Sequence, residues 1–216
     1  MSFLQKLIHS KKEAPPTEEE ILQQIIAGQD YSVLPEFPYY PRAYEDGTIH
    51  PAEHAVCACC GKEVPCLYGG HFHFLEHARG QQFQEVCPWC IASGAAARKF
   101  HGVFCKVKDI SDVPEETQAL IRERTPCFDG WKEEQWLSHC GDMMEYLGTA
   151  GYEELIACGS AEFLDALTAL AEEEVSWDGG KAESVLKRLD GDGSPRAYAF
   201  RCRQCGIITG YYDYKP

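Results

Sequence analysis

The chain has 216 residues, of which 44% are hydrophobic and 12% aromatic, a composition that excludes disorder as a description of the whole. Its 20 basic and 34 acidic residues give a formal charge of −14, which argues against nucleic acid as a partner and favours a cationic protein. No apolar run approaches the roughly 20 residues that span a bilayer, so we predict no transmembrane segment.

The first residues, "MSFLQKLIHSKKEAPP", contain neither a long apolar segment nor a small-residue cleavage site, so we expect no secretion signal. Twelve cysteines in such a chain favour a reducing compartment, where thiols bind metals or react and do not form disulfides. We therefore expect a cytoplasmic protein.

Residues 1–33 are predicted to form an N-terminal helical extension. The apolar side chains of "SFLQKLIH", residues 2–9, share one helical stripe. Thr17, followed three residues later by Glu20, is typical of a capping box that begins a second helix, and Gly28 is a suitable end for it.

Residues 34–108 are predicted to form a zinc module. Its first part is rich in proline and aromatic residues, which indicates extended chain or an edge strand leading into a turn. Residues 63–86 alternate and carry Gly-Gly and Arg-Gly breaks, so they predict a β-hairpin or small meander. The small residues after "CPWC" at 87–90 favour a helix.

Residues 109–190 are predicted to be mostly helical, and residues 191–216 to form two strands around a turn. Amphipathic spacing and turn residues mark helices within 112–126, 159–174 and 180–195. The segment 130–148 belongs to the same helical region, with aromatic residues as candidates for burial and a break near Gly141.

Three Cys-x-x-Cys pairs carry the clearest chemical signal. Two of them, "CACCG" and "CRQCG", continue at once into glycine, which is typical of a tight turn whose backbone amides point at sulfur. The order of "CACCG", a β-rich stretch and "CPWC" at a helix start is that of a treble-clef zinc module. We therefore expect one zinc ion at Cys57, Cys60, Cys87 and Cys90.

A redox dithiol at Cys87 and Cys90 is the rival interpretation, because strand–Cys-Pro-Trp-Cys–helix also suits a thioredoxin-like site. Such a site needs a preceding βαβ unit, which the upstream sequence does not supply. The thiol-disulfide oxidoreductase therefore remains an alternative, beside a metal-dependent hydrolase of unrecognised type.

The third pair, Cys202 and Cys205, needs further ligands for a second zinc site, and "SHCGD" offers His139 and Cys140. Adjacent residues rarely ligate one ion together without strain, so we expect either one to serve. We interpret Cys59 as a residue beside the first site that does not bind the ion. Four further cysteines are interpreted as small buried hydrophobic residues: Cys66, Cys105, Cys127 and Cys158. His71 and His73 fit a partly exposed strand face better than a metal site.

The ordered blocks resemble the CbrC family of bacterial proteins, which is linked to colicin tolerance. The blocks are "LPEFPYYP", "CACCG", "CPWCIASGAAARKF", "RTPCFDGWKEEQWLSHCGD", "YLGTAG" and "LDGDGSPRAYAFRCRQCG", and they cover about residues 34–214. The resemblance implies a cytoplasmic protein with paired cysteines, no catalytic residue to carry over, and protection against a toxin. A basic protein toxin would suit the negative charge as a partner.

Together these observations predict an α+β fold: a treble-clef-like zinc module, a helical middle segment and a C-terminal β-hairpin packed as one compact unit. The predicted function is that of a non-enzymatic zinc-binding protein in bacterial toxin tolerance or immunity, acting through protein binding.

Overall fold

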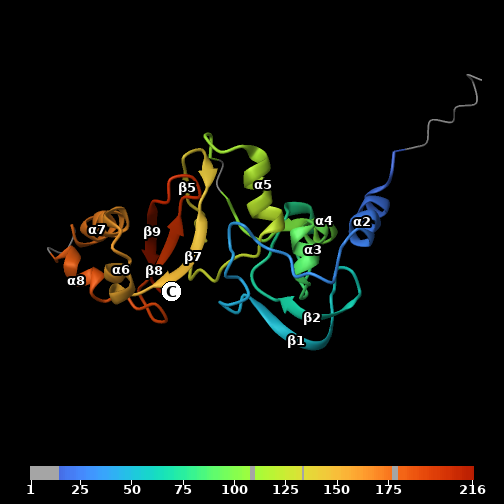
Figure 1. Ribbon diagram of the computed structural model, residues 1–216, viewed down its shortest axis with the longest axis horizontal. Helices are drawn as coiled ribbons and strands as arrows, with labels where there is room; N and C mark the ends of the chain where they lie inside the picture. Colours follow the sequence, from blue (N-terminus) through green and yellow to red (C-terminus); the bar gives the residue numbers. More distant parts are fainter. Residues whose placement is uncertain (1–14, 108–109, 133, 177–179) are drawn as a thin grey trace, which may run out of the picture.

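The computed structural model describes residues 15–107, 110–132, 134–176 and 180–216, and Figure 1 shows them as two halves along the long axis of the molecule. The predicted helix over residues 2–9 lies outside these residues. The described chain is a mixture of helices and antiparallel strands, as the sequence indicates. No helix within these ranges combines the length and the apolar character needed to cross a membrane.

Helix α2, Glu18–Ala27, begins and ends at the residues that the sequence predicts. The Thr17 hydroxyl accepts a hydrogen bond from the Glu20 amide at 3.2 Å, and the Glu20 carboxylate accepts one from the Thr17 amide at 2.7 Å. This reciprocal pair is the predicted capping box. The amide of Gly28 closes the helix by donating to the Gln24 carbonyl at 3.1 Å.

The first hairpin of the structure joins β1, Ile49–Val56, to β2, Glu63–Tyr68, with the "CACCG" turn between them. This finding corrects the hairpin predicted within residues 63–86. There, an isolated bridge joins Tyr68 to Val86, and β2 forms its ladder with β1 instead. The short β3, His73–Phe74, pairs instead with β4, Gly102–Val103, and a single 3-10 turn, η1, occupies Glu76–Ala78.

Three helices complete this half of the molecule. Helix α3, Pro88–Ala92, starts within the "CPWC" segment as predicted, with proline in its first position. Gly94 has a φ of +78° and separates α3 from α4, Ala95–Phe100, so the expected single helix is two short ones. Helix α5, Glu115–Arg124, follows Pro114 and ends at Thr125.

The helical prediction is wrong for residues 130–148. This segment contains β5, Ser138–His139, β6, Asp142–Met143, and β7, Glu145–Ala150. Cys140 and Gly141 have φ values of +54° and +72°, so they form a two-residue reverse turn that a helix cannot contain. Tertiary structure decides the conformation of this segment, because β7 pairs along its length with β8, Arg196–Arg201.

The second half consists of the antiparallel sheet β7–β8–β9 with helices against one side (Figure 1). Strands β8 and β9, Ile208–Asp213, form the predicted C-terminal hairpin. Helix α7, Ala161–Val175, packs against β9 and against α8, Ala182–Leu186. Helix α6, Tyr152–Cys158, follows β7, and Phe163 and Leu167 of α7 are fully buried in the core that these elements share.

Aromatic side chains join the two halves. Phe128, which follows α5, is 1% exposed and stacks on Tyr146 of β7 with ring centroids 4.1 Å apart. Its ring also meets Trp136 at 5.4 Å and Phe200 of β8 at 5.8 Å. The main core cluster runs from Cys57, Cys87 and Cys90 to these rings, so the halves share one apolar interior.

We expect Phe128→Ala to lower the free energy of unfolding by about 3–5 kcal/mol, because it leaves a cavity among rings that cannot collapse onto one another. Urea unfolding followed by tryptophan fluorescence measures this loss. The control is Ile156→Ala at a side chain 48% exposed on α6, which should cost less than about 1 kcal/mol. Equal losses would contradict the central role of the Phe128 ring.

Candidate metal centres

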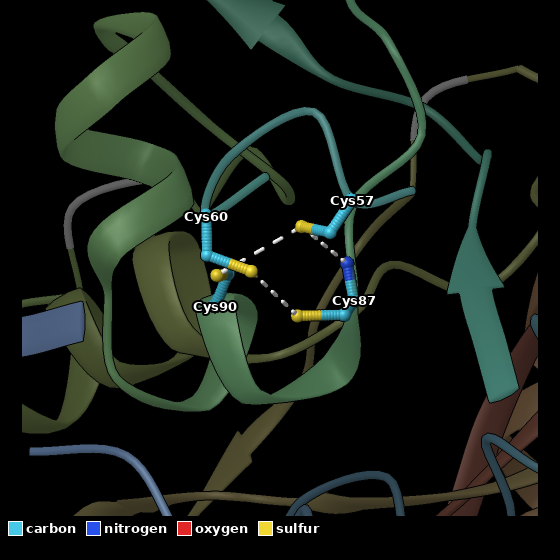
Figure 2. Close-up of side chains that lie close together, drawn as sticks. All are labelled: Cys57, Cys60, Cys87 and Cys90. Atoms are coloured by element: carbon cyan, nitrogen blue, oxygen red, sulfur yellow. Dashed lines mark hydrogen bonds between the residues drawn. The ribbon is translucent and has the colours of Figure 1, made fainter. Parts of the chain in front are cut away.

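The first candidate centre is formed by the two cysteine pairs of the N-terminal half. Cys57 and Cys60 lie in the turn between β1 and β2, and Cys87 and Cys90 lie at the start of α3 (Figure 2). All four sulfur atoms lie within 4.8 Å of one another. The Sγ atoms of Cys57 and Cys90 are 3.9 Å apart, as are those of Cys60 and Cys87.

These distances fit a tetrahedral ion. A zinc–sulfur bond of about 2.3 Å gives a tetrahedron with edges of about 3.8 Å between sulfur atoms. Both measured Sγ–Sγ separations lie close to that value. The first group therefore has the donor types and the spacing that a metal ion with four sulfur ligands requires.

Backbone hydrogen bonds hold the "CACCG" turn in shape. The Gly61 amide donates to the Cys57 carbonyl at 2.8 Å, and the Cys57 amide donates to the Lys62 carbonyl at 2.9 Å. Gly61 has a φ of +71°, which explains why glycine follows the second cysteine. The turn also aims the Cys59 amide at the Cys57 sulfur, at 3.3 Å.

The electrostatic surroundings favour a thiolate at Cys57. Hydrogen bonding with the side chains of Cys87 and Cys90 lowers the pKa of Cys57, and the Cys87 amide donates to its sulfur at 3.2 Å. The contacts with Cys57 raise the pKa of Cys87 and Cys90. A metal ion bound by all four sulfurs would take the place of the thiol protons.

Burial and the contacts of neighbouring side chains shield the sulfur atoms of the first group from solvent. Cys57, Cys87 and Cys90 are 0% exposed, whereas Cys60 is half-buried. Gln29 donates to the Cys90 sulfur at 3.7 Å and to the Ser93 hydroxyl at 2.7 Å. The chain preceding the first strand thus covers one side of the centre.

Lysine side chains place positive charge beside this centre. Lys99 of α4 donates to the carbonyls of Ala58 and Cys59, at 3.0 and 2.7 Å. The ammonium of Lys62 lies 3.7 Å from the centroid of the Tyr31 ring, which itself packs on Trp89. Four thiolates and one divalent ion carry a net charge of about −2, which such cations offset.

The second candidate centre joins two turns of the C-terminal half. Cys202 and Cys205 lie between β8 and β9, and His139 and Cys140 lie at the turn between β5 and β6. The four donor atoms lie within 4.8 Å of one another. His139 Nδ1 is 3.1 Å from the Cys140 sulfur and 3.3 Å from the Cys205 sulfur.

These nitrogen–sulfur distances are a few tenths of an ångström shorter than the edge of about 3.6 Å that bond lengths to zinc predict. The sequence leads us to expect only one of His139 and Cys140 near the pair, but both are there. The left-handed conformation of Cys140 turns the chain so that adjacent donors face the same point.

The "CRQCG" turn repeats the geometry of the "CACCG" turn. The Gly206 amide donates to the Cys202 carbonyl at 2.9 Å, and the Cys202 amide donates to the Ile207 carbonyl at 2.8 Å. The Cys205 amide lies 3.5 Å from the Cys202 sulfur. Two segments far apart in the chain therefore fold into the same sulfur-directed turn.

The two candidate centres differ in exposure. Cys202 is 2% exposed, but Cys140 and Cys205 are exposed to solvent. Burial opposes ionisation of Cys202, yet the amides of Cys205 and Gln204 and the nearby His139 outweigh it and lower its pKa to about 6. Burial and the neighbouring sulfurs raise the pKa of Cys140 to about 11.

The remaining cysteines lie outside both groups. Cys66, Cys105 and Cys127 are buried, in agreement with the prediction, and Cys59 is 3% exposed beside the first centre. Cys158 is exposed at the end of α6, so its predicted burial is wrong. All twelve cysteines are free thiols.

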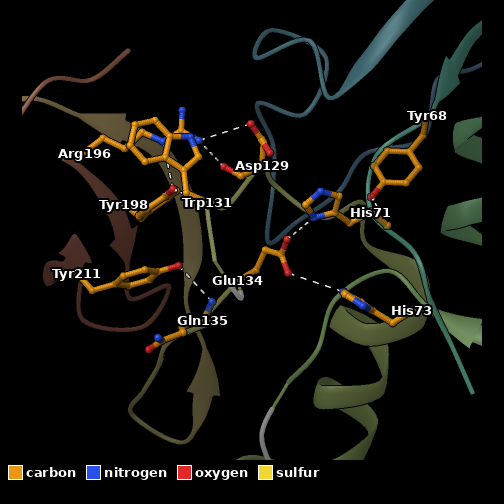
Figure 3. Close-up of polar contacts among 10 residues, drawn as sticks. All are labelled: Tyr68, His71, His73, Asp129, Trp131, Glu134, Gln135, Arg196, Tyr198 and Tyr211. Carbon is orange, nitrogen blue, oxygen red and sulfur yellow. Dashed lines mark hydrogen bonds and ion pairs between the residues drawn. The ribbon is translucent and has the colours of Figure 1, made fainter. Parts of the chain in front are cut away.

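A buried carboxylate connects the two histidines that the sequence places on one strand face. Glu134 is 4% exposed and lies 2.6 Å from Nδ1 of His71 and 3.8 Å from Nε2 of His73 (Figure 3). Beside it, the Tyr211 hydroxyl accepts a hydrogen bond from the Gln135 amide at 3.1 Å. This cluster fastens the segment after α5 to both halves of the molecule.

Comparison with known proteins places the chain in a family. A family model described as "Uncharacterised protein family (UPF0167)" matches residues 34–214. The chain belongs to the UPF0167 family. The UPF0167 protein Mb2317 of Mycobacterium bovis is 37% identical over 187 residues, which cover 84% of this chain and 94% of that protein.

Two further UPF0167 relatives match over similar lengths. MT2352 of Mycobacterium tuberculosis is also 37% identical over 187 residues, with the same coverage. PA1536 of Pseudomonas aeruginosa is 31% identical over 183 residues, which cover 83% of this chain and 96% of that protein. No solved structure matches the chain significantly.

The resemblance to the CbrC family is therefore wrong as an assignment. The family model and the relatives name UPF0167 over the same part of the chain. The connection to colicin tolerance depended on the CbrC name, and it does not carry over to this UPF0167 chain.

Sequence reasoning missed two polar residues of this UPF0167 structure. Glu134 lies within an expected helix among several acidic residues, and no spacing rule pairs it with His71 across 63 positions. Gln29 lies just after α2, where a polar side chain normally meets solvent, although it reaches the Cys90 sulfur. Neither leaves a local signal in the sequence.

We expect the stability supplied by Glu134 to disappear in acid. Burial raises the pKa of Glu134, but the imidazoles of His73 and His71 outweigh it and lower that pKa below the usual value of 4.5. Its charge therefore stabilises the fold at pH values above 4.5, and this contribution is lost as the pH falls through the lower folded pKa.

The test is Glu134→Gln. This substitution should lower the free energy of unfolding by about 1.5–3 kcal/mol at neutral pH, and by progressively less below the usual carboxyl pKa. Urea midpoints of both proteins at a series of pH values measure the difference. A difference that stays constant into acid would refute the assignment of a charged Glu134.

Proposed function

We propose that this protein is a non-enzymatic binding protein whose fold is held by two structural zinc ions. The first ion would be bound by Cys57, Cys60, Cys87 and Cys90, and the second by His139, Cys140, Cys202 and Cys205. The observation that supports the proposal is the convergence of four sulfurs in the first group, which all lie within 4.8 Å of one another and three of which belong to fully buried cysteines.

Zinc is favoured by the donor chemistry of both groups. Sulfur and imidazole nitrogen are the ligands of structural zinc sites, whereas magnesium and calcium prefer oxygen. Each group combines a Cys-x-x-Cys-Gly turn with two donors from another segment. In the first group, the turn lies at the end of the β1–β2 hairpin and the other donors lie at a helix start, which supports a treble-clef-like module.

The structural role is supported by what each ion would connect. The first would join the β1–β2 turn to α3, and the second would join the β5–β6 turn to the β8–β9 turn. Four protein donors complete a zinc tetrahedron and leave no position for an activated water, which distinguishes a structural ion from a catalytic one.

A thiol-disulfide oxidoreductase is the alternative from another class, and the geometry of the first group disfavours it. Exchange requires a thiolate that an external disulfide can reach. Cys87 and Cys90 are both 0% exposed, and each has a sulfur of the "CACCG" turn at 3.9 Å. This favours a scaffold over a redox centre.

The charge of the chain supports a protein partner for this scaffold. A formal charge of −14 would attract a cationic protein and speed its encounter at low salt. The same charge disfavours binding to nucleic acid phosphates. Twelve free thiols favour a reducing compartment, in keeping with the expected cytoplasmic location.

We expect the purified protein to contain about two zinc ions per chain, and Cys57→Ser and Cys205→Ser each to lose about one. Cys57→Ser should also unfold the N-terminal half, because zinc ligation contributes on the order of 10 kcal/mol to folding. Metal analysis by mass spectrometry and thermal unfolding measure both effects.

Cys59→Ser is the matched control, since Cys59 is buried in the same turn but lies outside the group of four. It should keep both ions. Unchanged zinc content and stability in the Cys57 and Cys205 variants would overturn the proposal. An insulin-reductase activity of the metal-free protein would favour the alternative.

We further expect Lys99→Met to weaken zinc binding at the first group by about tenfold, because the ammonium no longer compensates the thiolate charge through the Ala58 and Cys59 carbonyls. Competition with a chromophoric chelator measures the affinity. Arg98→Met, the neighbouring exposed cation of α4, should change it little. If both substitutions weaken zinc binding equally, the loss of affinity comes from the overall charge of the protein and not from the contacts of Lys99.

A further inference from the structure

A groove of about 820 Å³ lies on the N-terminal half, away from the four sulfurs of the first group. The ends of α4 and α5 form its walls, together with β4 and the helix α2. Neither candidate metal centre contributes a ligand to its lining. Its chemistry is therefore independent of the proposed zinc sites.

Basic side chains outnumber acidic ones in the lining of this groove, in contrast to the whole chain. Arg98, Lys106, Arg122 and Arg124 line it, against the carboxylates of Glu18 and Glu123. Arg98 is exposed and has no ion-pair partner within the described part of the chain. A cluster of four cations is notable in a protein whose formal charge is −14.

Existing contacts leave the charges of Arg98 and Arg124 available for a ligand. Arg122 is paired with Glu115, so its charge is largely compensated. Arg124 uses its Nε to donate to the Ala92 carbonyl at 2.6 Å, a bond that fixes the side chain but keeps the charge. The guanidinium of Arg124 and that of Arg98 thus both face the groove from separate helices.

Helix ends account for part of the pattern. Cations in the last turn of a helix are stabilised by the helix dipole, and this would explain any one of these arginines alone. It does not explain why two helix ends and the chain after β4 all contribute cations to one groove, nor why aliphatic side chains line the same groove.

The lining also includes aliphatic side chains, among them Ile25, Val103 and Val107. Leu75 belongs to the same lining, and 49% of its surface is exposed. A lining that combines aliphatic side chains with cations matches a ligand that carries an apolar side chain among carboxylates.

We propose that this groove binds an acidic segment of a partner protein, with an apolar side chain inserted beside Leu75 and carboxylates paired to Arg98 and Arg124. A protein segment is favoured over a single-stranded nucleic acid because the described lining offers a single aromatic ring, that of His101, on which a base could stack. The ligand of this groove would carry negative charge, whereas the net charge of the whole chain attracts a positively charged protein. The two modes of binding are therefore distinct.

The test begins with selection of short random peptides displayed on phage against the purified full-length chain. Enriched peptides should combine Asp or Glu with at least one Leu, Ile, Met or Phe. Fluorescence anisotropy with the synthetic peptide then gives the dissociation constant, which should rise with salt because the contacts are largely electrostatic.

Two variants test the charged and the apolar side chains of the groove lining separately. Arg98→Glu should weaken binding of the selected peptide by roughly tenfold, and Leu75→Ser by about fivefold. Lys215→Glu, a reversal at an exposed lysine outside the groove, should keep the affinity within about twofold. Zinc content and thermal unfolding confirm that each variant remains folded, which separates failure here from failure of the zinc proposal.

Three results would overturn the assignment. The first is enrichment of peptides without carboxylates. The second is equal affinity of the Arg98→Glu and unmodified proteins for the selected peptide. The third is displacement of that peptide by a single-stranded oligonucleotide at lower concentration than by unlabelled peptide, which would assign the groove to nucleic acid instead.

Discussion

The convergence of sulfur donors from distant turns is the constraint on which the N-terminal half depends. Cys57 and Cys90 are 33 residues apart in sequence, yet their sulfur atoms are 3.9 Å apart and buried. The elements around them are small, since α3 has five residues and β1–β2 is a two-stranded sheet, and they pack on the apolar core that both halves share. Under the proposed zinc assignment, an ion bound by the four sulfurs would add a cross-link between them.

The two halves are joined by packing of a different kind. The segment after α5 carries Phe128 into a cluster of aromatic rings, and Glu134 into contact with the histidines near β3. Apolar area supplies the stabilisation at the ring cluster, whereas the buried charge at Glu134 restricts which arrangement is compatible with it. This segment therefore positions the C-terminal sheet relative to the cysteine turns.

Local signals predicted much of this structure. The capping box at Thr17, the helix start at "CPWC" and both Cys-x-x-Cys-Gly turns are short-range features, and each is found at its predicted residues. The helical prediction for 130–148 was wrong because pairing of β7 with β8, which lies about 50 residues later, decides its conformation. The eight candidate donors named from the sequence do lie in two groups, and their role as metal ligands stays a prediction. Glu134 and Gln29 were not foreseen, since only tertiary structure brings them to their partners.

The spacing of the two groups along the chain has a consequence for how the protein is made. Donors of the first group are complete once Cys90 has left the ribosome, and the helix and hairpin that carry them are then also available. His139 and Cys205, in contrast, are separated by 66 residues, and the last strand follows Cys205. Under the proposed zinc assignment, the N-terminal half can acquire its ion before the C-terminal half has been made, whereas the sheet of the C-terminal half must wait until β9 has been synthesised.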